Sequence, residues 1–157
     1  MSEAARIADQ LRRAFDGEAW HGDSVFEILE GVTAEQAAAR PIKHAHTIWE
    51  LVLHIAAWDG AVLQRLGGVA VTLSDAENFP AATDASETAW RKERAEVRLV
   101  HEKLVVAVAA LPDSRLDDIV PGKEEEGVHY TFYYMLHGVV QHELYHAGQI
   151  ALLKKKM

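Results

Sequence analysis

The sequence predicts an all-α protein: a four-helix bundle formed by the whole chain, residues 1–157, as a single domain. Four segments of roughly 15 to 25 residues repeat apolar side chains at the helical period, and helices of this length bury such stripes most simply against one another. The chain is long enough for one domain with a substantial core. It contains no cysteine, so disulfides, thiolate nucleophiles and Cys-ligated metals are excluded.

The first helix is expected from about Glu3 to Asp16, where Ala, Ile, Leu and Phe recur at helical spacing. Two glycines interrupt the pattern, and Asp23-Ser24 then offers an N-cap for a short helix over residues 25–29. Thr33-Ala34-Glu35-Gln36 has the spacing of a capping box, and Pro41 ends the short turn that it starts. These short elements connect the first long helix to the second.

Three longer helices follow. The second is expected from near Thr47 to Gly67, and the third spans residues 86–110, where Pro112 stops it. The fourth spans residues 131–155. Residues 69–73 could make a short strand, although no obvious partner strand is available to pair with it.

The link between the second and third helices determines the topology. Residues 67–85 form a stretch of about 19 residues, which at about 3.3 Å per extended residue can cover the ~38 Å length of a 25-residue helix. A crossover that places these two helices parallel is therefore possible, and it would give an up-down-down-up bundle. A looped-out antiparallel connection is equally allowed.

Charge and hydropathy exclude several classes of partner. The formal net charge of -8 opposes nucleic-acid binding, and the one basic cluster, Lys154-Lys155-Lys156, complements the C-terminal dipole of the last helix. No apolar run approaches the ~20 residues of a membrane span, and the N-terminus lacks the profile of a secretion signal. We expect a cytoplasmic protein that binds a small molecule and neither nucleic acid nor membrane.

Two histidines interrupt the apolar stripe of the fourth helix. His142 and His146 are four residues apart, so they lie on one face and can reach the same ion. Met135, Val139 and Leu153 share that face. A buried imidazole must hydrogen-bond or ligate, and a pair at this spacing favours a metal over two histidines bonded to neighbouring side chains.

A third ligand is expected from another core-facing position, and His54 on the second helix is the best candidate. Glu50, one turn earlier, could orient His54 or act as a base on a bound water, or it could be an ordinary solvated side chain. His137 is too far around its helix to share the ion. The remaining candidates are interpreted as surface histidines: His44, His46, His101 and His129.

The segment from His142 to His146 also matches H-E-x-x-H, the zinc motif of metalloproteases. A peptidase needs a further ligand, but no His, Asp or Glu follows His146. The extended metzincin motif fails as well, because Gln149 and Leu152 replace its Gly and last His. The peptidase interpretation is therefore not favoured, and Glu143 is interpreted as a surface acid.

The sequence resembles the DinB-like (YfiT-type) superfamily of small metal-binding four-helix bundles. The matching segments are Trp20-His21-Gly22, Leu29-Glu30-Gly31-Val32-Thr33-Ala34-Glu35-Gln36-Ala37, Arg40-Pro41, Ile48-Trp49-Glu50-Leu51-Val52-Leu53-His54-Ile55 and His142-Glu143-Leu144-Tyr145-His146-Ala147-Gly148-Gln149-Ile150. The resemblance implies that His54, His142 and His146 bind nickel, zinc or a similar divalent ion. It also implies the up-down-down-up order and a homodimer.

The family includes thiol S-transferases that use low-molecular-weight thiols, so we expect an S-transferase acting on electrophilic substrates. Because the chain has no cysteine, any reactive thiol must come from a small molecule. Two alternatives remain: a metal-dependent hydrolase with Glu50 or Glu143 as base, and a non-catalytic metal-binding bundle. The side chains expected around the cofactor pocket are Trp20, His21, Trp58 and Tyr145.

Overall fold

The structure, a computed structural model, describes the backbone of all 157 residues and every side chain outside residues 126–128. The elements are α1 (Glu3–Asp16), α2 (Val25–Ile28), α3 (Ala34–Ala38), α4 (Ile48–Leu66), α5 (Asp75–Asn78), α6 (Glu87–Ala109), the 3-10 turns η1 (Asp113–Arg115) and η2 (Glu124–His129), and α7 (Phe132–Lys155). The predicted all-helical class is confirmed. The short strand considered for residues 69–73 does not form, since the described backbone offers it no pairing partner.

A serine or threonine stands at the N-cap of each of the seven α-helices: Ser2, Ser24, Thr33, Thr47, Ser74, Ser86 and Thr131. A hydroxyl at this position accepts a hydrogen bond from a free N–H of the first turn, so it marks where a helix can begin. At α2, α3, α4 and α5 a Glu or Gln three residues later completes a capping box. These local signals explain why the four long helices lie within a residue of their predicted bounds.

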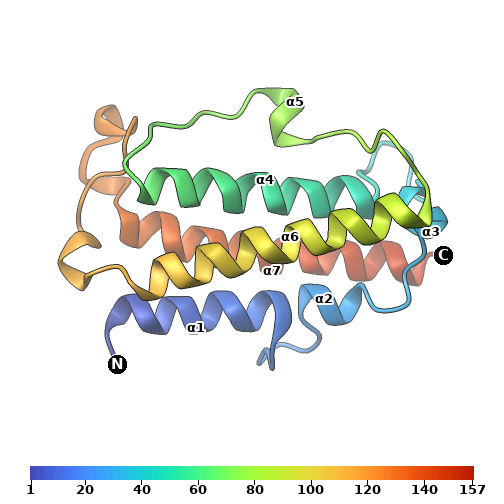
Figure 1. The fold of residues 1–157 in the computed structure, drawn as a ribbon, viewed down its shortest axis with the longest axis horizontal. Helices are drawn as coiled ribbons and strands as arrows, with labels where there is room; N and C mark the ends of the chain where they lie inside the picture. The colour runs from blue at the N-terminus through green and yellow to red at the C-terminus, as the bar shows by residue number, and fades with distance from the viewer.

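The four long helices lie side by side (Figure 1). α4 packs against α6 and α7, and α1 packs against the same two helices, so α1 and α4 are diagonal neighbours. The colours of Figure 1 show α1 and α7 running from left to right and α4 and α6 from right to left. The link that carries α5 passes along the outside of α4 before α6 begins.

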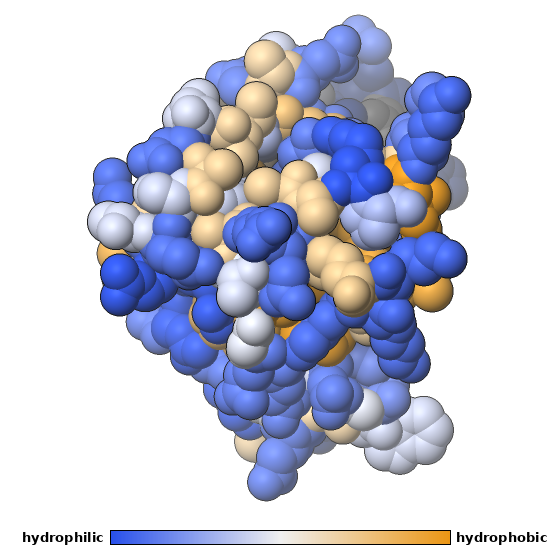
Figure 2. All heavy atoms as spheres, turned by 90° about the vertical axis from the view of Figure 1, so that its right-hand side faces the viewer, coloured by the Kyte–Doolittle hydropathy of each residue, from blue (hydrophilic) through white to orange (hydrophobic). Residues whose placement is uncertain are grey.

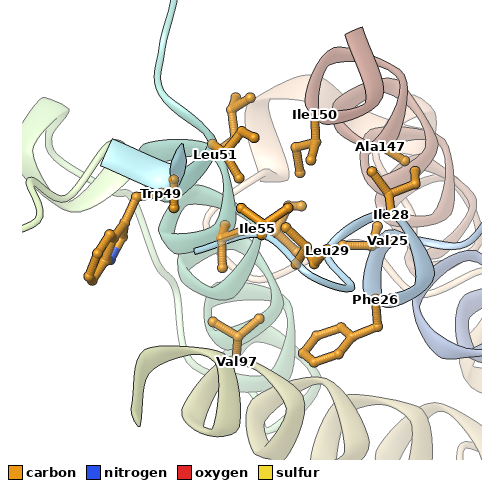
Figure 3. Packing of buried hydrophobic residues seen from close by; sticks show 14 of the residues in the cluster. Val25, Phe26, Ile28, Leu29, Trp49, Leu51, Ile55, Val97, Ala147 and Ile150 are labelled. Atoms are coloured by element: carbon orange, nitrogen blue, oxygen red, sulfur yellow. The ribbon is translucent and has the colours of Figure 1, made fainter. Parts of the chain in front are cut away.

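Two apolar clusters fill the bundle. One gathers side chains of α2, α3, the first half of α4, the first half of α6 and the last turns of α7; most of the side chains labelled in Figure 3 point toward one another, whereas Trp49 points away from them. The other joins α1 to the second half of α4, the end of α6 and the start of α7. Each of the three longest helices crosses both clusters, and on each helix one polar residue is buried at the crossing: Asp59, His101 and Glu143.

Hydrophilic side chains cover most of the end of the molecule shown in Figure 2, and hydrophobic atoms show between them in limited areas. None of the described helices combines the length and the apolar character that crossing a membrane would require.

Candidate metal centre

The structure brings together the three histidines that were predicted as ligands. Nε2 of His142 lies 2.9 Å from Nε2 of His54 and 3.0 Å from Nε2 of His146. One nitrogen of each ring falls within a group whose members are no more than 4.8 Å apart. His54 is contributed by the middle of α4 and the other two by successive turns of α7, so the pairing of these helices builds the cluster.

The outer nitrogens of two of these rings are held by hydrogen bonds. Nδ1 of His54 donates to the backbone carbonyl of Asn78 at 2.5 Å, and the ring stacks on Phe79 with centroids 4.0 Å apart. Nδ1 of His146 donates to Oε1 of Gln149 at 2.7 Å. A ring that carries its proton on Nδ1 presents a lone pair on Nε2, which is the form that ligates a metal.

The resulting arrangement of lone pairs fits a cation. Nε2 of His142 faces the lone pairs of both His54 and His146, but it can donate at most one hydrogen. At least one of the two contacts therefore sets lone pair against lone pair unless a positive ion lies between them. Metal–nitrogen bonds of about 2.1 Å place neighbouring ligands about 3 Å apart, in agreement with the observed spacing.

Burial keeps these imidazoles neutral. Removal from water, together with the positive charges that His146 and His54 would carry, lowers the pKa of His142 to about 3. Burial is also the main cause of the lowered pKa values of His54 and His146. Neutral imidazole is the ligating species, so the cluster is prepared for a metal without first losing protons.

Glu50, predicted as a catalytic base, makes other contacts. Its carboxylate accepts a hydrogen bond from the Thr47 N–H at 2.8 Å and one from Arg40 at 2.7 Å, and Nδ1 of His46 lies 3.3 Å away. Burial raises the pKa of Glu50, but the Thr47 N–H and Arg40 outweigh burial and lower it overall. The carboxylate thus serves the N-terminal cap of α4, and its catalytic role stays a prediction.

Trp58 and Tyr145, two of the four residues expected around the pocket, lie beside the histidines. The Trp58 ring centroid is 6.0 Å from that of His142, and its indole N–H donates to Oδ1 of Asn78 at 2.8 Å. Tyr145 meets His146 edge to face with centroids 5.1 Å apart, although its side chain remains 65% exposed.

Trp20 and His21 are placed elsewhere. Both are exposed, and they line a separate depression together with Gln10 of α1 and Leu144 of α7. The two glycines that flank this segment belong to an irregular stretch between α1 and α2. The prediction that these two residues surround the cofactor has no support from their position.

A cavity of about 360 Å³ opens beside His142 and Trp58, within the size range of small-molecule sites. It runs between the second half of α4 and the first half of α7. Its other lining residues are Val62, Arg65, Tyr130, Tyr133, Tyr134, Met135, His137, Gly138, Val139 and Gln141.

A second polar cluster, which sequence reasoning missed, lies in the core. Nδ1 of His101 donates to Oδ2 of Asp59 at 3.0 Å and lies 3.1 Å from Oε1 of Glu143. All three side chains are buried, and the His101 ring stacks on Phe15 with centroids 3.8 Å apart. The interpretation of His101 and Glu143 as surface residues was therefore wrong, because each lies on the inward face of its helix.

The charges of this cluster compensate one another. Burial alone would lower the pKa of His101, but hydrogen bonding to Asp59 and Glu143 raises it to about 9. Burial, reinforced by the charge of Asp59, raises the pKa of Glu143 to about 8. One imidazolium beside one carboxylate and one neutral carboxylic acid makes the group neutral near pH 7. Glu143 of the H-E-x-x-H segment is thus engaged in this buried cluster.

Comparison with known proteins gives a family match. The model of the DinB superfamily matches residues 19–150, a range that contains all three histidines of the cluster. Neither the curated proteins nor the solved structures that were compared contain a match to this chain.

Proposed function

The chain belongs to the DinB superfamily, and on this premise we propose that it is a metal-dependent S-transferase that joins a small-molecule thiol to an electrophilic substrate. His54, His142 and His146 would hold one divalent ion, nickel or zinc. The observation that carries the proposal is the convergence of three neutral imidazoles, in which Nε2 of His142 lies 2.9 Å from Nε2 of His54 and 3.0 Å from Nε2 of His146. A set of imidazole nitrogens suits either of these metals.

Each residue around the ion has a distinct task in this proposal. A divalent ion supplies Lewis acidity, which lowers the pKa of a thiol or water bound at an open position. Asn78 and Gln149 hold the rings of His54 and His146 in the ligating tautomer. The cavity beside Trp58 receives the substrate and limits the access of water to it.

The alternatives are less well supported. A metal-dependent hydrolase needs a base for the attacking water, and both predicted bases, Glu50 and Glu143, are engaged in other interactions. A non-catalytic metal bundle has no need of a cavity beside the ion, yet one adjoins His142. Thiol transfer needs no base to activate a water molecule, because the thiol itself is the nucleophile. The chain has no cysteine, so this thiol must come from a small molecule.

Two further properties belong to the proposal. The directions of the long helices in Figure 1 support an up-down-down-up order, with the α5 link as the crossover. The resemblance noted above also leads us to propose a homodimer, which light scattering of the purified protein would test.

Metal analysis of protein purified without added ions provides the first test. We expect about one nickel or zinc ion per chain, lost in His142→Ala and retained in His44→Ala, whose side chain is exposed. The second test measures thiol-dependent consumption of an activated aryl halide, which should disappear in His54→Ala. Unmutated protein that carries no stoichiometric metal would contradict the site, and unchanged turnover in His54→Ala would contradict the transferase.

A further inference from the structure

The cavity beside His142 is lined by a guanidinium, that of Arg65, within an acidic protein. Its lining residues include Arg65, His137 and His142, and none of the Asp and Glu side chains that the structure describes lines it. The protein as a whole carries a formal net charge of -8. A hollow whose described lining holds a guanidinium and no carboxylate attracts anions and not cations.

The guanidinium of Arg65 is only partly satisfied by hydrogen bonds. Its side chain is only 3% exposed, and one guanidinium nitrogen, Nη2, donates to the carbonyl of Val71 at 2.7 Å. The other two nitrogens, Nε and Nη1, have no hydrogen-bond partner among the residues that the structure describes. A buried guanidinium with unsatisfied N–H groups is costly, and its planar fork matches the two oxygens of a carboxylate.

Arg65 lies on the same helix as His54, one of the three histidines. Arg65, Trp58 and His54 share one face of α4, because they are spaced by seven and four residues. The guanidinium carbon lies 5.6 Å from the Trp58 ring, and the Trp58 ring lies 6.0 Å from that of His142. One aromatic side chain therefore separates the guanidinium from the candidate metal centre.

We propose that Arg65 binds the carboxylate of a small organic acid that lies along Trp58 with its other end directed toward the three histidines. The aromatic rings of Trp58, Tyr130 and Tyr133 form the wall for the apolar part of this ligand. The role of the acid as a reactant, either the thiol or the electrophile, rests on the proposed function. Carboxylate binding by Arg65 does not.

Binding of phenylacetate and of its uncharged amide, phenylacetamide, to the full-length protein tests the assignment by calorimetry. The two probes have nearly the same shape and differ in charge. We expect the acid to bind roughly ten- to hundredfold more tightly, because a hydrogen bond to a charged group contributes that much. Equal binding of the two probes by the unmutated protein would overturn the proposal.

Variants of Arg65 identify the group responsible. Arg65→Gln should lose the preference for the acid while binding the amide as before, and Arg65→Lys should retain part of the preference through its charge. Arg91→Gln, on the exposed face of α6, is the matched control and should change neither affinity. Circular dichroism measures whether each variant is folded. If Arg65→Gln does not fold, the test uses Arg65→Lys, in which the preference for the acid should be reduced.

A bound metal could also attract the carboxylate, so the metal-free variant His54→Ala is the decisive control. His54 is not among the residues that line the cavity. Persistence of the preference in His54→Ala supports Arg65, whereas loss there combined with persistence in Arg65→Gln assigns the carboxylate to the metal and overturns the proposal. The metal content of the same samples tests the proposed function separately. The protein could lack a metal and still bind the carboxylate through Arg65, or hold a metal and show no Arg65-dependent binding.

Turnover then shows which reactant carries the carboxylate. With an uncharged electrophile, a lower KM for 3-mercaptopropionate than for 3-mercaptopropanol places the carboxylate on the thiol. A lower KM for an acidic electrophile than for its amide, with one uncharged thiol, places it on the electrophile. Either difference must shrink about tenfold or more in Arg65→Gln, and a difference that this variant leaves intact counts against the assignment.

Discussion

At the scale of single residues, the side-chain amide of Gln149 forms a hydrogen bond with His146, one of the proposed metal ligands. Its Oε1 accepts the Nδ1 proton of His146, which leaves the lone pair of that ring on Nε2. We expect Gln149→Leu to bind nickel or zinc roughly 10- to 100-fold more weakly, as is typical when the group that orients a ligand is removed. Competition with a chromogenic chelator measures this change.

Gln64, an exposed glutamine of α4 that does not line the cavity, provides the control, because no described hydrogen bond joins its side chain to a histidine. Gln64→Leu should leave the metal affinity unchanged, and Gln149→Glu, which keeps an acceptor at the same place, should retain most of it. Equal affinities in Gln149→Leu and in the unmutated protein would show that this bond does not orient the ligand.

The buried cluster at Asp59 makes the stability of the fold depend on pH. The pKa of His101 is raised from 6.5 to about 9, so the folded protein holds this proton more tightly than the unfolded chain. The stability gained is fully present below pH 6.5 and is lost as the pH rises through about 9. We predict that the free energy of unfolding, measured with urea, falls between these two pH values.

The double variant Asp59→Asn/Glu143→Gln checks the cause of this pH dependence. Without the two carboxylates, burial lowers the pKa of His101 instead of raising it, so the decline above pH 6.5 should disappear. An equally steep decline in the double variant would assign the pH dependence to groups outside the cluster.

The residues of this cluster also show what the sequence could not reveal. His101 shares a face of α6 with the buried residues Val97, Leu104 and Val108, and this spacing was a signal in the sequence that His101 points inward. The charged neighbours of His101 along the chain obscured that signal. Its partners lie on α4 and α7, and only tertiary packing brings them together.

At the scale of elements, local chemistry determined what could be predicted. Helix ends followed from capping residues that act within three or four positions, so the long helices were placed correctly. α5 was missed, although Ser74 and Glu77 form a capping box there, because a helix of 4 residues has too little periodicity to recognise. Yet α5 ends at Asn78, whose carbonyl holds His54. The link between α4 and α6, whose sequence has no helical periodicity, thus supplies part of the candidate metal site.

The cap of α4 makes a prediction about Glu50. Glu50→Ala removes the acceptor of the Thr47 N–H and should lower the free energy of unfolding by about 1 kcal/mol, a typical capping contribution. Glu50→Gln keeps an acceptor oxygen, so its loss should be smaller, and it should retain thiol-dependent turnover. Glu96→Ala, at an exposed position of α6, serves as the control for stability. Abolished turnover in a stably folded Glu50→Gln would instead establish Glu50 as the catalytic base.

At the scale of the whole molecule, the two apolar clusters determine how the protein depends on its metal. Both are built without the three histidines, so the bundle has a complete apolar core in the absence of an ion. We therefore expect the metal-free protein to be folded and helical. This behaviour differs from that of zinc fingers, whose small cores cannot hold the chain together alone.

A metal that binds only the folded protein must still raise its stability. At a free concentration about 100 times the Kd the gain is about 2.7 kcal/mol, which for a chain of this length raises the Tm by roughly 5 to 10 °C. Scanning calorimetry of metal-free and zinc-loaded protein measures this shift, and His142→Ala should show none. Because His54 and His142 tie α4 to α7, hydrogen exchange in these two helices should slow on loading. If the metal-free chain had no helical structure, the ion would be required for folding of the whole bundle and not only for the geometry of the metal site.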